Sequence, residues 1–492
     1  MSNISRRSFL KTGTVAAAAL TVVPSSILGK SHGYTAPSDK LNIAGVGIGG
    51  RGSAVLRNLQ QENIVALCDV DWKYSKATFD RYPNAKRYWD YRKMFDEMGD
   101  SIDAVMCATA DHTHALVAST ALTMGKHVYC EKPLTHSVYE SRLLTKLAAK
   151  YQVATQMGNQ GSSGEGVDLT CEWIWNGEIG EVTKVEAFTD RPIWPQGINT
   201  PEKADKIPST LNWDLFTGPA VVRPFNHIYH PWNWRGWWAY GTGALGDMAC
   251  HILHPVFKAL KLGYPTKVQG SSSLLLRDCA PQSQRVKLTF PARDNMPKLG
   301  LPQVEVHWFD GGLRPELPEG FPAGRNLNDS GGGVIFYGTK DTLICGCYGV
   351  RPWLLSGRVP SVPQTCRRVE NAMGGGHEKD WIRACKENKS SRVLSKSDFS
   401  EAGPFNEMVV MGVLAVRLQE LYKELEWDGL NMQFTNITDS EKIALTIKDG
   451  FHIKDGHPSF DKPAEDPISA KAFAEELIKH TYREGWSLPA MP

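Results

Sequence analysis

The stretch that decides the fold is Leu41-Asn42-Ile43-Ala44-Gly45-Val46-Gly47-Ile48-Gly49-Gly50. Its first part is a short apolar run typical of a buried parallel strand, and a helical pattern follows Gly50. Gly45, Gly47 and Gly50 form a G-x-G-x-x-G pattern, in which glycine lets the backbone approach a pyrophosphate at a helix N-terminus. Asp69, 19 residues beyond Gly50, ends the next apolar run and can accept hydrogen bonds from ribose hydroxyls. The sequence therefore predicts a dinucleotide site.

The cofactor that we expect at this site is NAD. The negative charge of Asp69 disfavours the additional phosphate of NADP. Arg51 follows the last glycine directly, and its guanidinium could offset that preference, so NADP stays open as the alternative.

Short apolar runs alternate with helical patterns as far as Met157. The expected strands cover residues 41–46, 64–69, 104–108, 127–130 and 153–157. This alternation is typical of a doubly wound parallel sheet, so we predict an α/β fold with an N-terminal Rossmann domain at residues 38–157.

The rest of the chain predicts a second domain. Residues 182–188, 267–276 and 285–290 have the pattern of strands, among long loops rich in Trp and Pro. We expect an α+β domain at residues 158–400, serving substrate binding and oligomerisation, with a large, mainly antiparallel open sheet. Helical spacing from Phe405 to Leu425 predicts a helix that packs back on the core with the rest of 401–492.

The N-terminus carries an export pattern. Ser5-Arg6-Arg7-Ser8-Phe9-Leu10-Lys11 precedes a small apolar run from Val15 to Val23, which predicts a twin-arginine signal at residues 1–30. We expect the protein to fold around its cofactor before export to the periplasm or beyond, and an uncleaved leader could retain it there. Outside the cytoplasm a released cofactor is not replaced, so we expect it to be tightly bound. No other apolar stretch is long enough to predict a membrane span in the mature protein.

Composition narrows the class of protein further. The net charge of +2, without a basic tail, argues against nucleic-acid binding. Cys68, Cys107 and Cys130 lie in apolar runs, so we expect free, buried thiols. On a strand, Cys345 and Cys347 would share one face at about 6 to 7 Å, wider than two thiolates on one zinc ion.

We also expect no metal site. His112 with His114, and His251 with His254, lie close in sequence, but no cysteine stands at a standard zinc spacing from either pair.

Two further motifs carry a resemblance. The stretches Ala108-Thr109-Ala110-Asp111-His112-Thr113-His114 and His127-Val128-Tyr129-Cys130-Glu131-Lys132-Pro133-Leu134, together with the glycine pattern, resemble the Gfo/Idh/MocA oxidoreductase family. The resemblance implies that Lys132 reaches nicotinamide and substrate, that its bond to Pro133 is often cis, and that Thr109, His114 and Glu131 belong to the cofactor site. Ala110 departs from the proline that is frequent there.

The family's second signature is matched by Gly246-Asp247-Met248-Ala249-Cys250-His251. On a helix, Asp247 and His251 share one face, so a carboxylate and an imidazole can converge on one hydroxyl. The resemblance implies that His251 is the general acid/base, that Asp247 is its partner or a substrate ligand, and that Lys132 polarises the reacting oxygen. The alternative is a helix cap and a core histidine.

An aromatic cluster suggests a sugar pocket. Trp232, Trp234, Trp237 and Trp238 stand close to Arg235 and Tyr240, and indole faces stack on sugar C–H surfaces. We expect at least half of these tryptophans to be core or interface residues. The predicted substrate residues are Trp194, Arg235, Trp238, Tyr240 and, from a glycine turn, His377.

The leading hypothesis is an exported NAD(P)-dependent oxidoreductase that acts by hydride transfer on a ring hydroxyl or ketone of a sugar or glycoside. One alternative is a redox-neutral NAD-dependent glycosidase of the same fold, acting by oxidation and elimination. A second alternative is a non-catalytic, cofactor-bound sugar sensor. The resemblance also implies that another subunit covers the open sheet, in a homodimer or homotetramer.

Overall fold

The computed structural model describes residues 39–327, 331–446, 450–461 and 466–492, so the predicted signal segment lies outside the described residues. The N-terminal domain is a six-stranded sheet in the order β3-β2-β1-β4-β5-β6, and every neighbouring pair is parallel. The strands are β1 Asn42–Val46, β2 Asn63–Cys68, β3 Lys86–Tyr88, β4 Ala104–Cys107, β5 His127–Cys130 and β6 Thr155–Met157. The predicted doubly wound sheet is confirmed. Strand β3 was not predicted, because three residues are too few to show a strand pattern.

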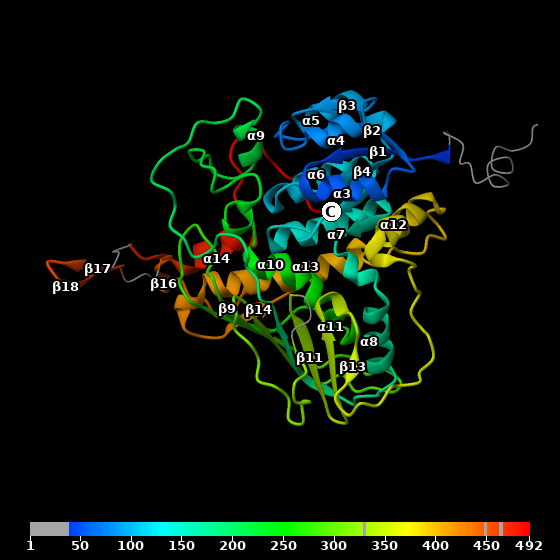
Figure 1. Ribbon diagram of the computed structural model, residues 1–492, viewed down its shortest axis with the longest axis vertical. Helices are drawn as coiled ribbons and strands as arrows, with labels where there is room; N and C mark the ends of the chain where they lie inside the picture. Colours follow the sequence, from blue (N-terminus) through cyan, green and yellow to red (C-terminus); the bar gives the residue numbers. More distant parts are fainter. Residues whose placement is uncertain (1–38, 328–330, 447–449, 462–465) are drawn as a thin grey trace, which may run out of the picture.

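Helices connect these strands and lie on the two faces of the sheet (Figure 1). They are α3 Gly50–Asn58, α4 Lys76–Arg81, α5 Tyr91–Met98, α6 Asp111–Thr123 and α7 Val138–Tyr151. The chain order reverses between β1 and β4, so their carboxyl ends open a crevice at the edge where ligands bind in such sheets.

The second domain is built on a nine-stranded sheet in the order β13-β12-β11-β7-β10-β9-β8-β14-β15. Its strands are β7 Val182–Phe188, β8 Lys267–Ser272, β9 Gln284–Phe290, β10 Val304–Phe309, β11 Gly333–Gly338, β12 Thr342–Gly346, β13 Trp353–Leu354, β14 Leu425–Asp428 and β15 Gln433–Phe434. Strands β7 and β10 run parallel and the other neighbours antiparallel, which confirms the mainly antiparallel sheet.

Six helices accompany this sheet in the chain. They are α8 Glu165–Trp175, α9 Trp213–Thr217, α10 Gly243–Ile252, α11 His254–Ala259, α12 Gly376–Lys386 and α13 Phe399–Arg417. Helix α13 packs against α7 of the first domain and against β8 and β9 of the second, so it holds the two domains together (Figure 1).

The C-terminal helix differs from the prediction. We predicted a helix from Phe405 to Leu425, but α13 begins at Phe399 and ends at Arg417. Tyr422 adopts a left-handed conformation with φ of 50°, and Leu425 then pairs with Val268 of β8. Sheet pairing therefore overrides the helical spacing in this segment.

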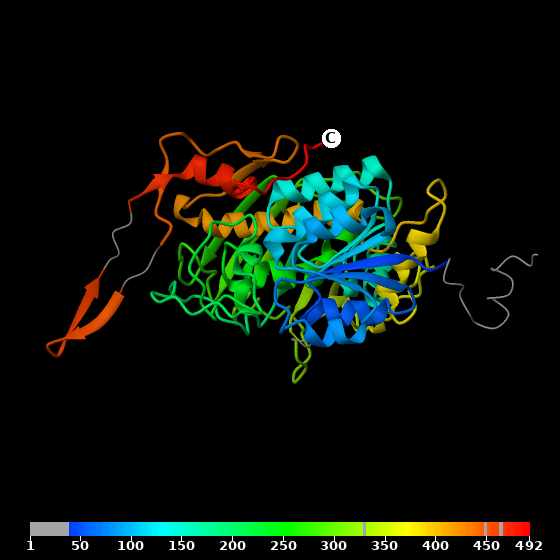
Figure 2. The same ribbon diagram turned by 90° about the horizontal axis from the view of Figure 1, so that it is seen from above.

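The tail returns to the body of the protein. It contains β16 Lys442–Ile443, β17 Gly450–Lys454, β18 His457–Asp461, β19 Ile468–Ser469 and α14 Ala470–Ile478. Helix α14 packs on α13 and α7, and Arg483 pairs with Asp214 at 2.7 Å. The hairpin β17–β18 projects away from the body (Figure 2). The predicted boundaries of the signal segment (1–30), the two domains (38–157 and 158–400) and the C-terminal segment (401–492) remain predictions.

All ten cysteines are free, and Cys68, Cys107 and Cys130 are buried on β2, β4 and β5 as predicted. Cys345 lies in β12, but β12 ends at Gly346 and Cys347 begins a short 3₁₀ turn, so the two residues do not share a strand face. Within the described ranges, no helix has both the length and the apolar content to cross a bilayer.

Candidate functional site

A cavity of about 500 Å³ lies at the crevice between the domains. It is lined from the first domain by the glycine turn after β1 and by Asp69, Thr109, Glu131 and Lys132. The second domain contributes Trp232, Trp234, Arg235 and His251 to the same cavity. Residues from both predicted halves of the site therefore face one space.

The glycine turn has the geometry of a pyrophosphate cradle. Gly47 has φ of 74°, and a Cβ there would lie 2.6 Å from the backbone of Ala108 and Thr109. A Cβ on Gly52 would lie 1.9 Å from the carbonyl oxygen of Gly47. Gly45 is less constrained, since its Cβ would approach Ile48 Cγ2 at 3.0 Å. The turn therefore needs glycine at Gly52 as well, a position that the motif did not include.

Asp69 lies immediately after β2, buried at the floor of the cavity. Its Oδ2 accepts hydrogen bonds from the backbone N–H groups of Ile48 at 2.8 Å and Gly49 at 3.1 Å, and Oδ1 accepts from Asp71 at 2.9 Å. Burial raises the pKa of Asp69, and these donors oppose the rise. The carboxylate thus braces the glycine turn, and Oδ1 keeps a lone pair for a ribose hydroxyl.

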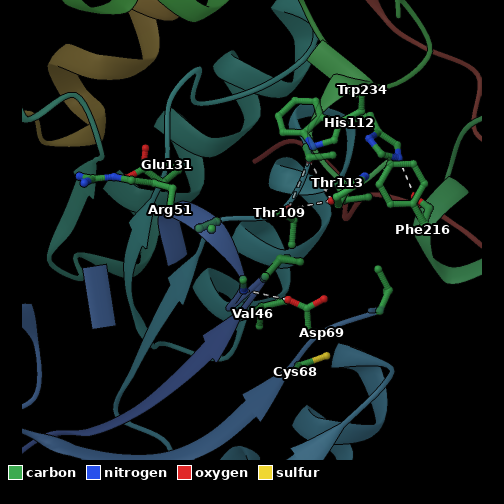
Figure 3. Close-up of a pocket in the computed structure, with 18 of the residues that line it drawn as sticks. Val46, Arg51, Cys68, Asp69, Thr109, His112, Thr113, Glu131, Phe216 and Trp234 are labelled. Carbon is green, nitrogen blue, oxygen red and sulfur yellow. Dashed lines mark hydrogen bonds and ion pairs between the residues drawn. The ribbon is translucent and has the colours of Figure 1, made fainter. Parts of the chain in front are cut away.

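Arg51 points away from Asp69 (Figure 3). Its Nε donates to Glu131 Oε1 at 2.8 Å, and its pKa is raised chiefly by that carboxylate. Glu131 is buried, and Gly158 makes room for it, because a Cβ there would lie 2.6 Å from the carboxyl carbon. The guanidinium is therefore engaged with Glu131, while Arg51 also lines the cavity.

Thr109 and His114 shape the wall beyond β4. Thr109 Oγ1 accepts a hydrogen bond from Thr113 at 2.7 Å and lines the cavity (Figure 3). His114 is buried and is not part of the lining; its Nδ1 lies 2.8 Å from the Pro133 carbonyl and its Nε2 lies 3.1 Å from that of Thr109. His114 therefore ties the loop after β4 to the loop after β5 rather than contacting a ligand.

The fold brings together three residues of types that bind metal ions, although their spacing in the sequence did not predict a metal site. Ligand atoms of Cys107, His114 and Cys130 lie within 4.8 Å of one another. Both ring nitrogens of His114 already face carbonyl oxygens, so we assign no metal role to this group.

An ion pair joins Lys132, which lines the cavity, to Asp247, which lies behind the lining. Lys132 Nζ donates to Asp247 Oδ1 at 2.6 Å and to the Asp247 carbonyl at 3.2 Å, and Arg235 Nε donates to the same Oδ1 at 3.0 Å. The two cations, Lys132 first, hold the pKa of Asp247 well below its usual range against the effect of burial. An ammonium has three N–H donors, so Lys132 keeps one for a substrate oxygen.

His251 lies on α10 one turn after Asp247 and lines the cavity. Its Nδ1 is buried and has no hydrogen-bond partner among the described residues, and its ring lies 4.6 Å from that of Tyr348. Burial, assisted by the positive charge of Lys132, lowers the pKa of His251 well below 6.5. The imidazole is therefore neutral at neutral pH and can accept a proton.

The tryptophans divide as expected. Trp232 and Trp234 line the cavity, and the Arg235 guanidinium lies 5.0 Å and 4.3 Å from their ring centres. Trp237 is fully buried in the core. Trp194 stands behind Trp232, with ring centres 5.6 Å apart, and donates to Gln196 instead of facing the cavity.

Besides Trp194, three more of the predicted substrate residues do not line this cavity. Trp238 is buried beside a second cavity, and Tyr240 is fully buried among aromatic rings. His377 lies not on an open glycine turn but in α12, fully buried, with its nitrogens 2.7 Å from Ser163 Oγ and 2.8 Å from the Met157 carbonyl. The geometry makes these residues parts of the framework.

Several residues that line the first cavity were not predicted from the sequence. Tyr74 covers the glycine turn, since a Cβ on Gly49 would lie 2.3 Å from its ring. Tyr348, Gln160 and His230 reach the cavity from distant segments. No motif marks them, because only the tertiary fold brings their loops to the crevice.

Comparison with known proteins agrees with this geometry. Residues 41–159 match the family model described as oxidoreductase family, NAD-binding Rossmann fold, and residues 175–292 match that of the family's C-terminal alpha/beta domain. The chain belongs to the Gfo/Idh/MocA oxidoreductase family. Its Rossmann domain is thus of the NAD-binding type, and residues 3–23 match the signal sequence of the twin-arginine translocation pathway.

The proteins that the chain is similar to include ones named as dehydrogenases and one named as a glycosyl hydrolase. The chain is 31% identical over 142 residues to inositol 2-dehydrogenase of Salmonella typhimurium, covering 28% of this chain and 42% of that protein. It is 28% identical over 213 residues to glycosyl hydrolase family 109 protein 1 of a Shewanella strain, covering 38% of this chain and 46% of that protein. The chain thus spans less than half the length of either relative.

A solved structure with the same fold is that of an inositol dehydrogenase homolog from Azotobacter vinelandii in complex with NADH and myo-inositol. It superposes with a TM-score of 0.52 at 15% sequence identity, covering 79% of this chain and 98% of that one. At this identity the likeness concerns the fold.

Proposed function

We propose that the protein is an exported, NAD-dependent oxidoreductase that acts on a ring hydroxyl or ketone of a sugar or glycoside. The observation that carries the proposal is that Lys132 and Arg235, which share Asp247 Oδ1, line one cavity with His251 and the glycine turn. The cofactor supplies hydride transfer to and from the ring carbon.

The residues of this chain have separable roles in the proposed reaction. The free N–H of Lys132 holds the reacting oxygen, and neutral His251 accepts the hydroxyl proton as the ketone forms. Asp247 is a positioning residue that keeps Lys132 and Arg235 aimed at that oxygen. Trp232 and Trp234 offer indole faces to the sugar ring.

A redox-neutral glycosidase is the second candidate. The relative named as a glycosyl hydrolase and the export signal favour it, because a hydride that returns to the substrate in each turnover needs no outside acceptor. In this reaction, oxidation of one hydroxyl acidifies the neighbouring C–H, His251 or another base removes that proton, and the aglycone leaves by elimination. Addition of water and return of the hydride complete the hydrolysis.

One experiment separates these candidates. Denatured protein is analysed for released NAD(H), and untreated protein is incubated with a panel of sugars and aryl glycosides, with and without added NAD. Formation of NADH with a free sugar supports the oxidoreductase, whereas aglycone release without added NAD supports the glycosidase. Lys132→Ala, with the exposed Lys389→Ala as control, should reduce either activity at least ~100-fold. Sugar binding without turnover on the whole panel would favour the sensor.

A further inference from the structure

A second cavity, of about 250 Å³, lies where the tail closes over the first domain. Its walls come from the loop before α7, the segment 219–239, the end of α13, and α14 with the residues after it. The two cavities share His112 in their linings. Nothing in the proposed reaction uses the other groups of this second cavity.

The unusual group in this cavity is Arg417, the last residue of α13. Its guanidinium lies between two aromatic rings, 5.4 Å from the ring centre of Trp238 and 5.0 Å from that of Phe473. The side chain is half-buried, and among the described residues it has no hydrogen-bond or ion-pair partner, although a guanidinium has five N–H donors. Burial lowers the pKa of Arg417 to about 10, and the group still carries its charge at neutral pH.

The acidic groups around Arg417 are engaged with other partners. Asp278 accepts from Thr200 Oγ1 at 2.8 Å and from Arg223 at 3.3 Å. Glu476 accepts from the N–H and the hydroxyl of Thr481, at 2.8 Å and 2.7 Å.

The third carboxylate of the cavity is also committed. The Glu140 carboxylate accepts hydrogen bonds from the Tyr482 hydroxyl and from the backbone N–H groups of His136 and Ser137. Each carboxylate of the lining thus has donors of its own. Asp278 and Glu476 favour the charge of Arg417 from a distance, but neither forms an ion pair with it.

A half-buried cation whose N–H donors have no partner is stabilised by a ligand that accepts them. A planar guanidinium pairs best with a carboxylate or phosphate-type group, which accepts two parallel N–H donors. We propose that this cavity binds a small oxyanion, a carboxylate or a phosphate-type group, which pairs with Arg417 between Trp238 and Phe473. The ligand joins the first domain, the segment 219–239 and the C-terminal helices.

Thermal unfolding tests the proposal on the full chain. The Tm is measured in sodium chloride, sulfate, phosphate and glucuronate at equal ionic strength. We expect one class of oxyanion to raise the Tm by about 2 °C or more above chloride, because a ligand that binds only the folded state stabilises it. A response to glucuronate alone identifies a carboxylate site, and a response to sulfate and phosphate identifies a phosphate-type site. Equal Tm values in all four salts would overturn the proposal.

Variants locate the effect. Arg417→Met should abolish the oxyanion-dependent shift, and Arg417→Lys should weaken it, since lysine cannot form the bidentate pair. Arg325→Met is the matched control, because Arg325 also lies over an indole ring, 3.4 Å from the centre of Trp353. A full shift in Arg417→Met would overturn the assignment. Titration calorimetry of wild-type protein with phosphate and glucuronate decides the matter even where a variant does not fold, since an absence of binding heat for both contradicts the proposal.

Discussion

Lys132 Nζ lies 2.6 Å from Asp247 Oδ1, and this ion pair joins residues 115 positions apart in the chain. Lys132 follows β5 of the Rossmann domain, whereas Asp247 lies in α10 of the second domain. The pair therefore fixes the lysine across the domain boundary, and Arg235 approaches the same oxygen from a third segment. A carboxylate held between two cations is a positioning device, because it sets where their remaining donors point.

Removing the charge of Asp247 tests that role. In Asp247→Asn the amide holds Lys132 and Arg235 less firmly, so kcat/KM should fall ~100-fold or more, and the Tm should also fall because two largely buried cations lose their carboxylate. Asp439→Asn is the control, because it removes a carboxylate from an exposed ion pair with Lys471. Steady-state kinetics on the substrate found by the panel gives the result; wild-type kcat/KM in Asp247→Asn would contradict the role.

The pH dependence of activity should reflect a neutral His251. Because burial and Lys132 lower its pKa well below 6.5, the base form persists as the pH falls through 6.5. The value of kcat/KM for sugar oxidation should therefore stay level from pH 8 to 6.5 and decline only at lower pH. A decline centred near pH 6.5 would show an ordinary imidazole and contradict the assignment. In Lys132→Met the His251 titration, followed by NMR, should move upward.

Gly52 should be the most sensitive glycine of the cofactor turn. A Cβ at Gly52 collides with the Gly47 carbonyl, so Gly52→Ala should lower the stability by about 1–3 kcal/mol and weaken NAD binding. Gly263→Ala is the matched control, because a Cβ there meets nothing within 4 Å. Thermal unfolding and NAD titration check both variants. Equal behaviour of the two alanine variants would contradict the proposed close approach.

Trp234 should contribute to substrate affinity. Its ring lines the cavity and lies against Arg235, so Trp234→Ala should raise KM about tenfold, whereas Trp234→Phe should keep much of the affinity. Trp353→Ala is the control, since Trp353 pairs with Arg325 away from this cavity. An unchanged KM in Trp234→Ala would place the sugar elsewhere.

The local signals in the sequence were reliable where chemistry depends on a short segment. The glycine turn, the acidic end of β2 and the Glu131-Lys132-Pro133 stretch each lie within a few residues of one strand end, so their pattern is readable along the chain. The spacing of Asp247 and His251 likewise predicts one helix face, and α10 carries both.

Contacts between distant segments could not be read in this way. Tyr240 was assigned to the substrate because it lies close to the tryptophans and Arg235, and His377 because it follows three glycines, yet each is fully buried. The segment from Tyr422 onward is not helical as predicted, because Leu425 pairs with Val268 of β8. Arg51 likewise pairs with the carboxylate of Glu131, which is 80 residues away in the chain.

The sequence by itself determined the Rossmann domain, the cofactor class and the identity of the residues in the cofactor motif, because these depend on periodicity and on backbone freedom at particular glycines. Only the tertiary structure decided which charges meet. It joined Lys132 to Asp247, turned Arg51 away from Asp69, and placed the half-buried Arg417 between two aromatic rings with no ion-pair partner among the described residues. Ion pairing depends on distances that close when separate segments pack together, and no local pattern contains them.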